Sequence, residues 1–180
     1  MSTTQILIAG FGGQGVLFAG KLLAYKGLLA DKQVSWLPSY GPEMRGGTAN
    51  CSVIISDDEE IGSPIVNIPD ILFSFNIQSF DKFESTVAPG GILFADSALI
   101  SKKSDRTDIK AFYIPATELA SKNDLQGGAN VIMLGKFVAE SGLFDKDEFI
   151  DHMVSSIPAT KAKLIANNRK AFDIGYNYKD

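Results

Sequence analysis

A glycine-rich hexamer directly follows the first apolar run of the chain and sets the main constraint on its fold. Residues 6–9 (ILIA) are too few and too continuously apolar for a helix, so they predict a strand buried on both faces. Residues 10–15 have the sequence GFGGQG, which satisfies the pattern G-x-G-x-x-G. Apolar residues at helical spacing then predict a helix over about residues 13–30. A strand, a glycine turn and a helix are the opening unit of many α/β folds.

Strand and helix patterns alternate along the next hundred or so residues. β-branched residues predict strands at 33–38, which Pro38 is expected to end, and at Thr48–Ser56. Only about ten residues separate these two strands, too few for a helical crossover, so the strand at 48–56 is expected to run antiparallel or to follow an unusual loop. Further strands are predicted at 69–76, 92–96 and 111–114, with short helices at 77–87 and after Thr117, whose hydroxyl is expected to cap that helix.

From Gly127 onward the pattern is helical only. The segment from Val131 to Leu134 is apolar nearly all round and predicts a buried helix, with Met133 and Phe137 in the core or under a partner. An amphipathic helix and a last helix from Pro158 to about residue 174 follow. We therefore predict one domain over residues 1–180: an α/β, Rossmann-like three-layer sandwich with a mostly parallel sheet, one antiparallel strand and a helical C-terminal part.

Composition argues against several classes of function. Seventeen Lys and Arg against 21 Asp and Glu give a net charge of −4, and no basic run exceeds two residues, so neither a nucleic-acid nor a membrane partner is expected. Cys51 is the only cysteine, too few for an iron–sulfur cluster, a disulfide or a structural zinc site. No charged leader or long apolar run is evident, so we expect a cytoplasmic protein.

No catalytic or metal-binding residue is predicted in this chain. His152 is the single histidine and falls beside the polar side of its predicted helix, so a boundary position is expected for it. Without a second histidine or an assignable partner, no Ser-His-Asp arrangement can be proposed. Cys51 alternates with polar neighbours in a strand and is expected to be a small core residue.

The glycine turn considered alone does not decide whether it binds a ligand. Free N–H groups at the following helix N-terminus could meet a phosphate, but the same glycines could pack helix against strand with no ligand. A dinucleotide site carries Asp or Glu at the end of the second strand, whereas that strand ends here in WLPS, residues 36–39. Arg45 is the only nearby candidate for an NADP phosphate, and no Lys-Ser/Thr pair forms a P-loop. A stand-alone NAD(P)-binding oxidoreductase is therefore the less favoured interpretation.

A second unusual loop, SYGPEMRGG at residues 39–47, combines three glycines with a proline. It predicts a rigid loop that presents Tyr40 and Arg45 to a ligand or partner, although a hairpin turn with a solvated Glu43–Arg45 pair is the alternative. Both loops follow the carboxyl ends of the first two predicted strands, so we expect them on one rim of the sheet. Residues from this rim and from later strand ends could form one surface: Gln14, Ser39, Tyr40, Arg45, Asn76 and Asp96.

The two loops together, with GGTAN after the second and GANVIMLG later on, resemble the gamma subunits of 2-oxoacid:ferredoxin oxidoreductases over about residues 6–142. The resemblance implies a subunit that is inactive alone. Its complex would convert a 2-oxoacid, coenzyme A and oxidised ferredoxin to acyl-CoA, CO2 and reduced ferredoxin. The 2-oxoglutarate type is the first candidate, with branched-chain 2-oxoacids and pyruvate as competitors, and a scaffold subunit without ligand is a further alternative.

The same resemblance implies where cofactors lie. Thiamine diphosphate, magnesium and iron–sulfur clusters belong to partner chains, namely alpha, beta and a ferredoxin-like delta chain, and this chain binds no cofactor alone. By analogy with coenzyme A-associated domains of single-chain relatives, Gly12, Gly13, Gln14 and Gly15 are expected near the coenzyme A route. The residues expected to face a partner or the active-site approach are Ser39, Tyr40, Glu43, Arg45 and Asn76.

Overall fold

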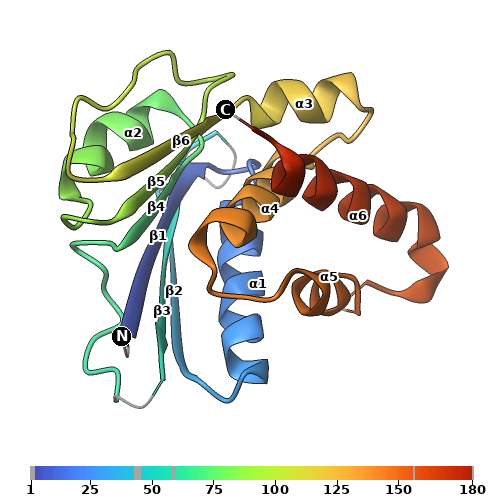
Figure 1. The fold of residues 1–180 in the computed structure, drawn as a ribbon, viewed down its shortest axis with the longest axis horizontal. Coiled ribbons are helices and arrows are strands. Elements are labelled where there is room, and N and C mark those ends of the chain that lie inside the picture. The colour runs from blue at the N-terminus through green and yellow to red at the C-terminus, as the bar shows by residue number, and fades with distance from the viewer. Residues whose placement is uncertain (1–2, 43–45, 58–59, 156, 180) are drawn as a thin grey trace.

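The computed structural model describes residues 3–42, 46–57, 60–155 and 157–179, and a twisted sheet forms its middle layer (Figure 1). The strand order in the described residues is β2-β3-β1-β4-β5-β6. β3 runs antiparallel to both of its neighbours, whereas β1, β4, β5 and β6 are mutually parallel, which confirms the predicted mostly parallel sheet with one antiparallel strand. The strands are β1 (Thr3–Phe11), β2 (Gln33–Tyr40), β3 (Thr48–Ser56), β4 (Ile71–Ser74), β5 (Ile92–Asp96) and β6 (Lys110–Ile114).

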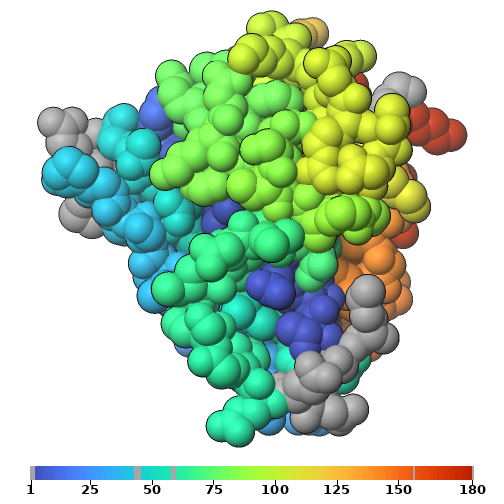
Figure 2. Space-filling view, turned by 90° about the vertical axis from the view of Figure 1, so that its left-hand side faces the viewer, coloured from blue at the N-terminus to red at the C-terminus, as the bar shows by residue number. Residues whose placement is uncertain are grey.

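Helices cover both faces of the sheet unequally. Figure 1 shows α1 (Val16–Leu29), α4 (Ala129–Ser141), α5 (Lys146–Ser155) and α6 (Ala162–Asn177) on one side, and α2 (Ile77–Phe83) on the other. α3 (Ala116–Lys122) lies near the carboxyl edge of the parallel strands. Figure 2 shows the α2 side, where α2 and its neighbouring segments cover much of the sheet. The result is the expected three-layer α/β sandwich with a helical C-terminal part.

The larger core lies between the sheet and the C-terminal helices. Val131, Met133, Leu134 and Phe137 of α4 are all buried within this chain, so Met133 and Phe137 belong to the core rather than to an interface. The Phe137 ring packs against β4 and β5, with its centroid 5.4 Å from that of Phe73 and 6.0 Å from that of Phe94. The all-round apolar character of α4 is therefore explained by burial on every side.

Several predicted boundaries were wrong. β2 does not end at Pro38 but continues to Tyr40, because β2 is an edge strand and an edge tolerates a residue without an N–H group. β4 covers only 71–74, and the segment predicted as one helix at 77–87 divides into α2 and a 3₁₀ turn at Glu84–Thr86. A second 3₁₀ turn, Ala159–Lys161, precedes α6, which ends at Asn177 rather than near residue 174.

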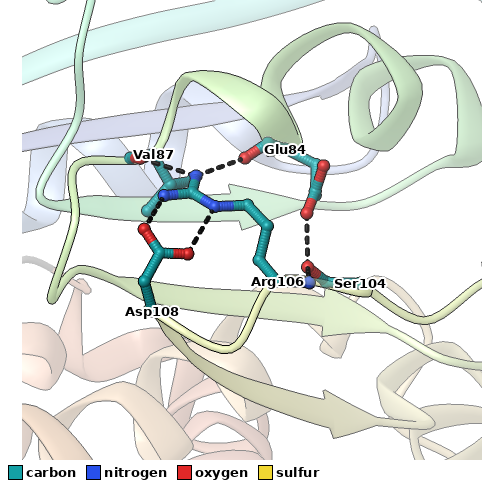
Figure 3. A network of polar contacts seen from close by, with 5 residues as sticks. All are labelled: Glu84, Val87, Ser104, Arg106 and Asp108. Carbon is teal, nitrogen blue, oxygen red and sulfur yellow. Dashed lines mark hydrogen bonds and ion pairs between the residues drawn. The ribbon is translucent and has the colours of Figure 1, made fainter.

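The long connection between β5 and β6 is held to the α2 layer by Arg106 (Figure 3). The guanidinium Nη1 donates to the carbonyl oxygen of Val87 at 2.7 Å, and Nε and Nη2 donate to both carboxylate oxygens of Asp108 at 2.9 and 2.6 Å. Ser104, in the same connection, is hydrogen-bonded to Glu84. Carbonyl and bidentate carboxylate bonds to one guanidinium fix the part of this connection around Arg106 against the segment that follows α2.

Candidate functional site at the carboxyl edge of the sheet

The two unusual loops are bonded to each other at the carboxyl edge. The Gly12 amide donates to the Gly47 carbonyl at 2.9 Å, and the Gly46 amide donates to the Gly12 carbonyl at 3.3 Å. These bonds continue the antiparallel ladder of β1 and β3, in which Phe11 lies opposite Thr48. The prediction that both loops share one rim is confirmed.

The glycine turn has a left-handed backbone at two positions. Gly13 has φ 104° and Gly15 has φ 76°, a region that side chains rarely adopt. Gly13 is exposed and a Cβ on it would meet no atom within 4 Å, so its outer side is open. Gly15 precedes α1 directly, and a Cβ there would lie 2.3 Å from Nδ2 of Asn130. The turn is therefore open toward solvent at Gly13 and closed against α4 at Gly15.

Gln14 locks the turn to the ends of β1 and β4. Its Oε1 accepts from the amide of Phe11 at 2.7 Å and from Nδ2 of Asn76 at 3.2 Å, and its Nε2 donates to the carbonyl of Phe75 at 2.9 Å. Asn76 is buried and caps α2, since its Oδ1 accepts from the Ser79 amide at 2.8 Å. The polar atoms of both side chains bond within the protein, so these two residues hold the rim in shape.

A cleft of about 330 Å³ opens beside the glycine turn, between that turn, α3 and the start of α4. This volume lies at the lower end of the range found for small-molecule sites. None of its lining side chains is charged. Its lining residues are Gly13, Gln14, Phe75, Leu99, Thr117, Ala120, Ser121, Gln126, Gly127 and Ala129.

Asp96 lies behind this cleft and is buried, not part of the exposed rim surface that the sequence suggested. Its carboxylate accepts from the Thr117 amide at 3.1 Å, the Thr117 hydroxyl at 2.6 Å and the Ala98 amide at 3.1 Å. Burial raises the pKa of the Asp96 carboxyl above its ordinary 3.8, while these hydrogen bonds oppose the rise. Thr117 therefore does not cap α3 as predicted; Asp96 supplies the acceptor from β5 instead.

Ser39 and Tyr40 lie at the exposed end of β2, on the outer side of the same rim. The Gly41 amide donates to the Thr48 carbonyl at 2.7 Å and keeps the chain paired with β3 one residue beyond β2. Glu43 and Arg45 lie outside the described residues, so their role at the rim stays a prediction.

The strand order weakens the dinucleotide interpretation further. β3 lies between β1 and β2, so the end of β2 is two strand spacings, about 10 Å, from the end of β1. A carboxylate at the end of β2 could not serve the glycine turn as it does where the two strands are neighbours. Gly46 and Gly47 are instead bonded against Gly12.

Two other reactive groups are away from the cleft. Cys51 is in the core, as predicted, and burial raises the pKa of its thiol to about 12. His152 has the expected boundary position, and burial together with the Lys26 charge lowers its pKa below the ordinary 6.5. Among the residues the structure describes, no group of three or more His, Cys, Asp or Glu side chains is arranged to hold a metal ion.

Sequence reasoning missed Asn130 and the α3 side of the cleft. Asn130 Nδ2 donates to the Gly15 carbonyl at 3.3 Å and joins α4 to the glycine turn across 115 positions of sequence. Asn130 lies in the GANVIMLG segment, but nothing in that segment alone indicates which turn it contacts. Ser121 and Gln126 have no sequence signal, because only the docking of α3 and of the turn after it brings them beside Gly13.

The fold and rim define a Rossmann-like α/β domain whose glycine turn is closed on one side by a second glycine loop. The family model described as pyruvate ferredoxin/flavodoxin oxidoreductase matches residues 5–178, and the chain belongs to that family. None of the helices in the described ranges combines the length and apolar character needed to cross a bilayer.

Individual relatives agree with this assignment. The chain is 40% identical to the ketoisovalerate oxidoreductase subunit VorA of Methanothermobacter marburgensis over 97% of its own length and 36% of VorA. It is 36% identical to the 2-oxoglutarate synthase subunit KorC of Methanocaldococcus jannaschii over 96% of its own length and 91% of KorC. A keto/oxoacid ferredoxin oxidoreductase gamma subunit from Geobacter sulfurreducens superposes with a TM-score of 0.80 at 30% identity, covering 96% of each chain.

The chain thus matches gamma subunits along nearly their whole length, which confirms the resemblance inferred from the two loops. By contrast, it spans about a third of the length of the VorA relatives it matches.

Proposed function

We propose that this chain is the gamma component of a 2-oxoacid:ferredoxin oxidoreductase and that its carboxyl-edge rim borders the path of coenzyme A to the active site. The near full-length match to KorC and to the Geobacter gamma subunit carries the proposal. In this proposal alpha and beta chains supply thiamine diphosphate and magnesium, and a ferredoxin-like delta chain supplies iron–sulfur clusters. A single buried cysteine in this chain is consistent with that division, because each cluster needs about four thiolates.

The open side of the glycine turn suits a phosphate or an amide of coenzyme A. No side chain caps the N-terminus of α1 and no acidic residue occupies its first turn, so its free N–H groups and positive potential favour an anion. Gly13 allows close approach because it has no side chain and open space beside it. Thr117, Ser121 and Gln126 offer hydrogen bonds along the cleft. A volume of about 330 Å³ suits one part of coenzyme A, with the rest lying against partner chains.

For the 2-oxoacid, we propose 2-oxoglutarate first, supported by 36% identity to KorC along 91% of that protein. A branched-chain 2-oxoacid is the second candidate, and the 40% identity to VorA specifically favours it. Pyruvate is the weakest of the three, because identity to the pyruvate synthase subunits PorC is only 26 and 28%.

The experiment is co-expression of this chain with its alpha, beta and delta companions, followed by assay of the purified complex. Reduction of ferredoxin or a viologen dye is measured with 2-oxoglutarate, 3-methyl-2-oxobutanoate and pyruvate, each with and without coenzyme A. We expect coenzyme A-dependent reduction, fastest with 2-oxoglutarate, and no activity from this chain alone. Tight, stoichiometric NADH or NADPH binding and activity by the isolated chain would instead favour the dinucleotide alternative.

The coenzyme A route is tested with a tryptophan placed in the cleft. Ser121→Trp fills the cleft from α3, whereas Lys122→Trp adds the same ring at the next position, which does not line it. In the assembled complex, Ser121→Trp should raise KM for coenzyme A by roughly tenfold or more, and Lys122→Trp should leave it within about twofold. Two results together would leave only a scaffold role for the rim. These are equal KM values for both variants and no protection of the amides of residues 12–15 from hydrogen exchange by coenzyme A.

A further inference from the structure

The outward stripe of α1 is apolar where a surface helix is normally charged. Phe18, Tyr25, Leu28 and Leu29 are 42, 50, 53 and 66% exposed, and the stripe carries one charged residue, Lys21. The opposite side of α1 is already buried on the sheet, so this helix is apolar nearly all round. Such a helix is typical of a position covered on both sides.

The neighbouring edge strand extends this apolar surface. α1 lies directly on β2, since a Cβ on Gly27 would be 2.8 Å from a methyl of Val34. On the same side of the sheet, β2 leaves Trp36 and Tyr40 exposed by 38 and 46%, whereas Leu37 points to the other side. Six of the twelve exposed large hydrophobic side chains in the described ranges therefore lie on α1 or on the neighbouring side of β2. We call these six residues and Lys21 the α1–β2 face.

A groove lies beside this face, between α1 and α5. It has a volume of about 440 Å³ and is lined by Phe18, Lys21, Leu22, Tyr25 and His152. Aromatic rings around a concave, mainly apolar space are the usual setting for an anchoring side chain of a protein partner.

The charge of the face indicates what covers it. Among the described residues no ion pair joins Lys21 to a carboxylate, and its Nζ lies 5.5 Å from the Tyr25 ring centroid. On α5, Glu148 and Asp151 are already paired with Lys26 and Arg169. A partner that brings an apolar side chain and a carboxylate to Lys21 would complement the face. A second copy meeting it across a two-fold axis on this stripe would bring two Lys21 side chains together.

The relatives and the rim indicate which protein this partner is. VorA from Methanothermobacter carries a region like this chain as about a third of a longer polypeptide, so there a larger protein region is covalently attached to it. The α1–β2 face also begins at the rim, because Tyr40 ends β2 and Phe18 follows the glycine turn by three positions. A companion that covers the proposed site at the rim would continue onto α1.

We propose that the α1–β2 face is the docking surface for the companion subunit that corresponds to the remaining two-thirds of VorA. This subunit inserts an apolar side chain into the groove between α1 and α5 and places a carboxylate at Lys21. The inference rests on the proposed function, since it names the surface by which this chain joins its complex.

The test is binding between this chain and the co-expressed, purified companion that matches the rest of VorA. The variant Phe18→Asp/Tyr25→Asp adds charge to the groove, and Leu164→Asp is the matched control on α6, where Leu164 is 44% exposed. The double variant should weaken binding roughly 100-fold or more while the control stays within about threefold. Lys21→Glu, a single exposed change that should leave folding intact, is expected to weaken binding roughly tenfold.

Each result has a distinct meaning. If the wild-type chain and the companion form no complex, the proposed function and this inference both fail. If they form one and Phe18→Asp/Tyr25→Asp and Lys21→Glu bind as the wild type does, only the docking surface is wrong. Dimers of this chain alone that are abolished by Phe18→Asp/Tyr25→Asp would assign the face to a second copy and overturn the inference. Should the double variant unfold, Lys21→Glu decides alone.

Discussion

Gly15→Ala tests the junction between the glycine turn and α4. Gly15 has φ 76°, and holding a side chain in that region costs about 1–2 kcal/mol. The new Cβ would also lie 2.3 Å from Nδ2 and 2.7 Å from Cγ of Asn130, so the amide must turn away. Its hydrogen bond to the Gly15 carbonyl would then be lost, at a further cost of about 1 kcal/mol. We expect a total destabilisation of about 2–3 kcal/mol.

The assay is chemical and thermal unfolding of the isolated chain. A loss of that size should lower Tm by roughly 4–12 °C in a chain of this length. Gly142→Ala is the matched control, because Gly142 has φ 64° but a Cβ there would meet no atom within 4 Å. The control should show the backbone cost only.

A double-mutant cycle with Asn130→Ala separates strain from contact. Removing the Asn130 side chain should make Gly15→Ala less costly by about 1 kcal/mol, giving a non-additive cycle. Equal losses for Gly15→Ala and Gly142→Ala, with additive effects in the cycle, would refute the reasoning about this contact.

Two further predictions concern the C-terminal helices and the base of the cleft. Gly175→Ala gains up to about 1 kcal/mol of helix propensity but places Cβ 1.8 Å from the Ile132 carbonyl of α4, so a net loss of at least about 2 kcal/mol is expected in denaturant melts. Gly27→Ala, whose nearest contact is a methyl group at 2.8 Å, should be near neutral; equal effects would contradict the argument. Asp96→Asn loses acceptors for Thr117 and should destabilise by about 1–3 kcal/mol. Burial raises the folded-state pKa of Asp96, so the stability that this group gives the wild type falls as pH rises above 3.8. The difference in unfolding free energy between the wild type and Asp96→Asn should therefore shrink as pH rises. A difference that grows with pH would contradict this prediction.

Much of the rim could be predicted because its determinants are local in sequence. The short apolar run before GFGGQG permits only a strand and a tight turn, and the short spacing between the next two strands predicted an antiparallel β3. Pro38 shows the limit of such local reasoning. Proline ends a central strand, and only the sheet order reveals that β2 is an edge, where the missing N–H group is tolerated.

The role of each rim side chain could be assigned only from the three-dimensional structure. Gln14 and Asn76 were expected to face a ligand or partner, and this stays a prediction; the structure adds that their polar atoms bond to each other and to nearby backbone. Asp96 was placed on the same surface but is buried beneath Thr117. A sequence shows that a polar residue follows a strand, but partners such as Asn76 for Gln14 and Thr117 for Asp96 lie tens of positions away in the chain.

The sequence by itself determined the layered α/β architecture, the buried α4 helix and the two glycine loops, because periodicity and backbone freedom are properties of neighbouring residues. Only the tertiary structure decided that β3 separates β1 from β2, that Asn130 closes the turn, and that α1 keeps an apolar face uncovered. These features depend on contacts between distant segments. Their energies come from burial and hydrogen bonds that exist only once the sheet and helices have packed together.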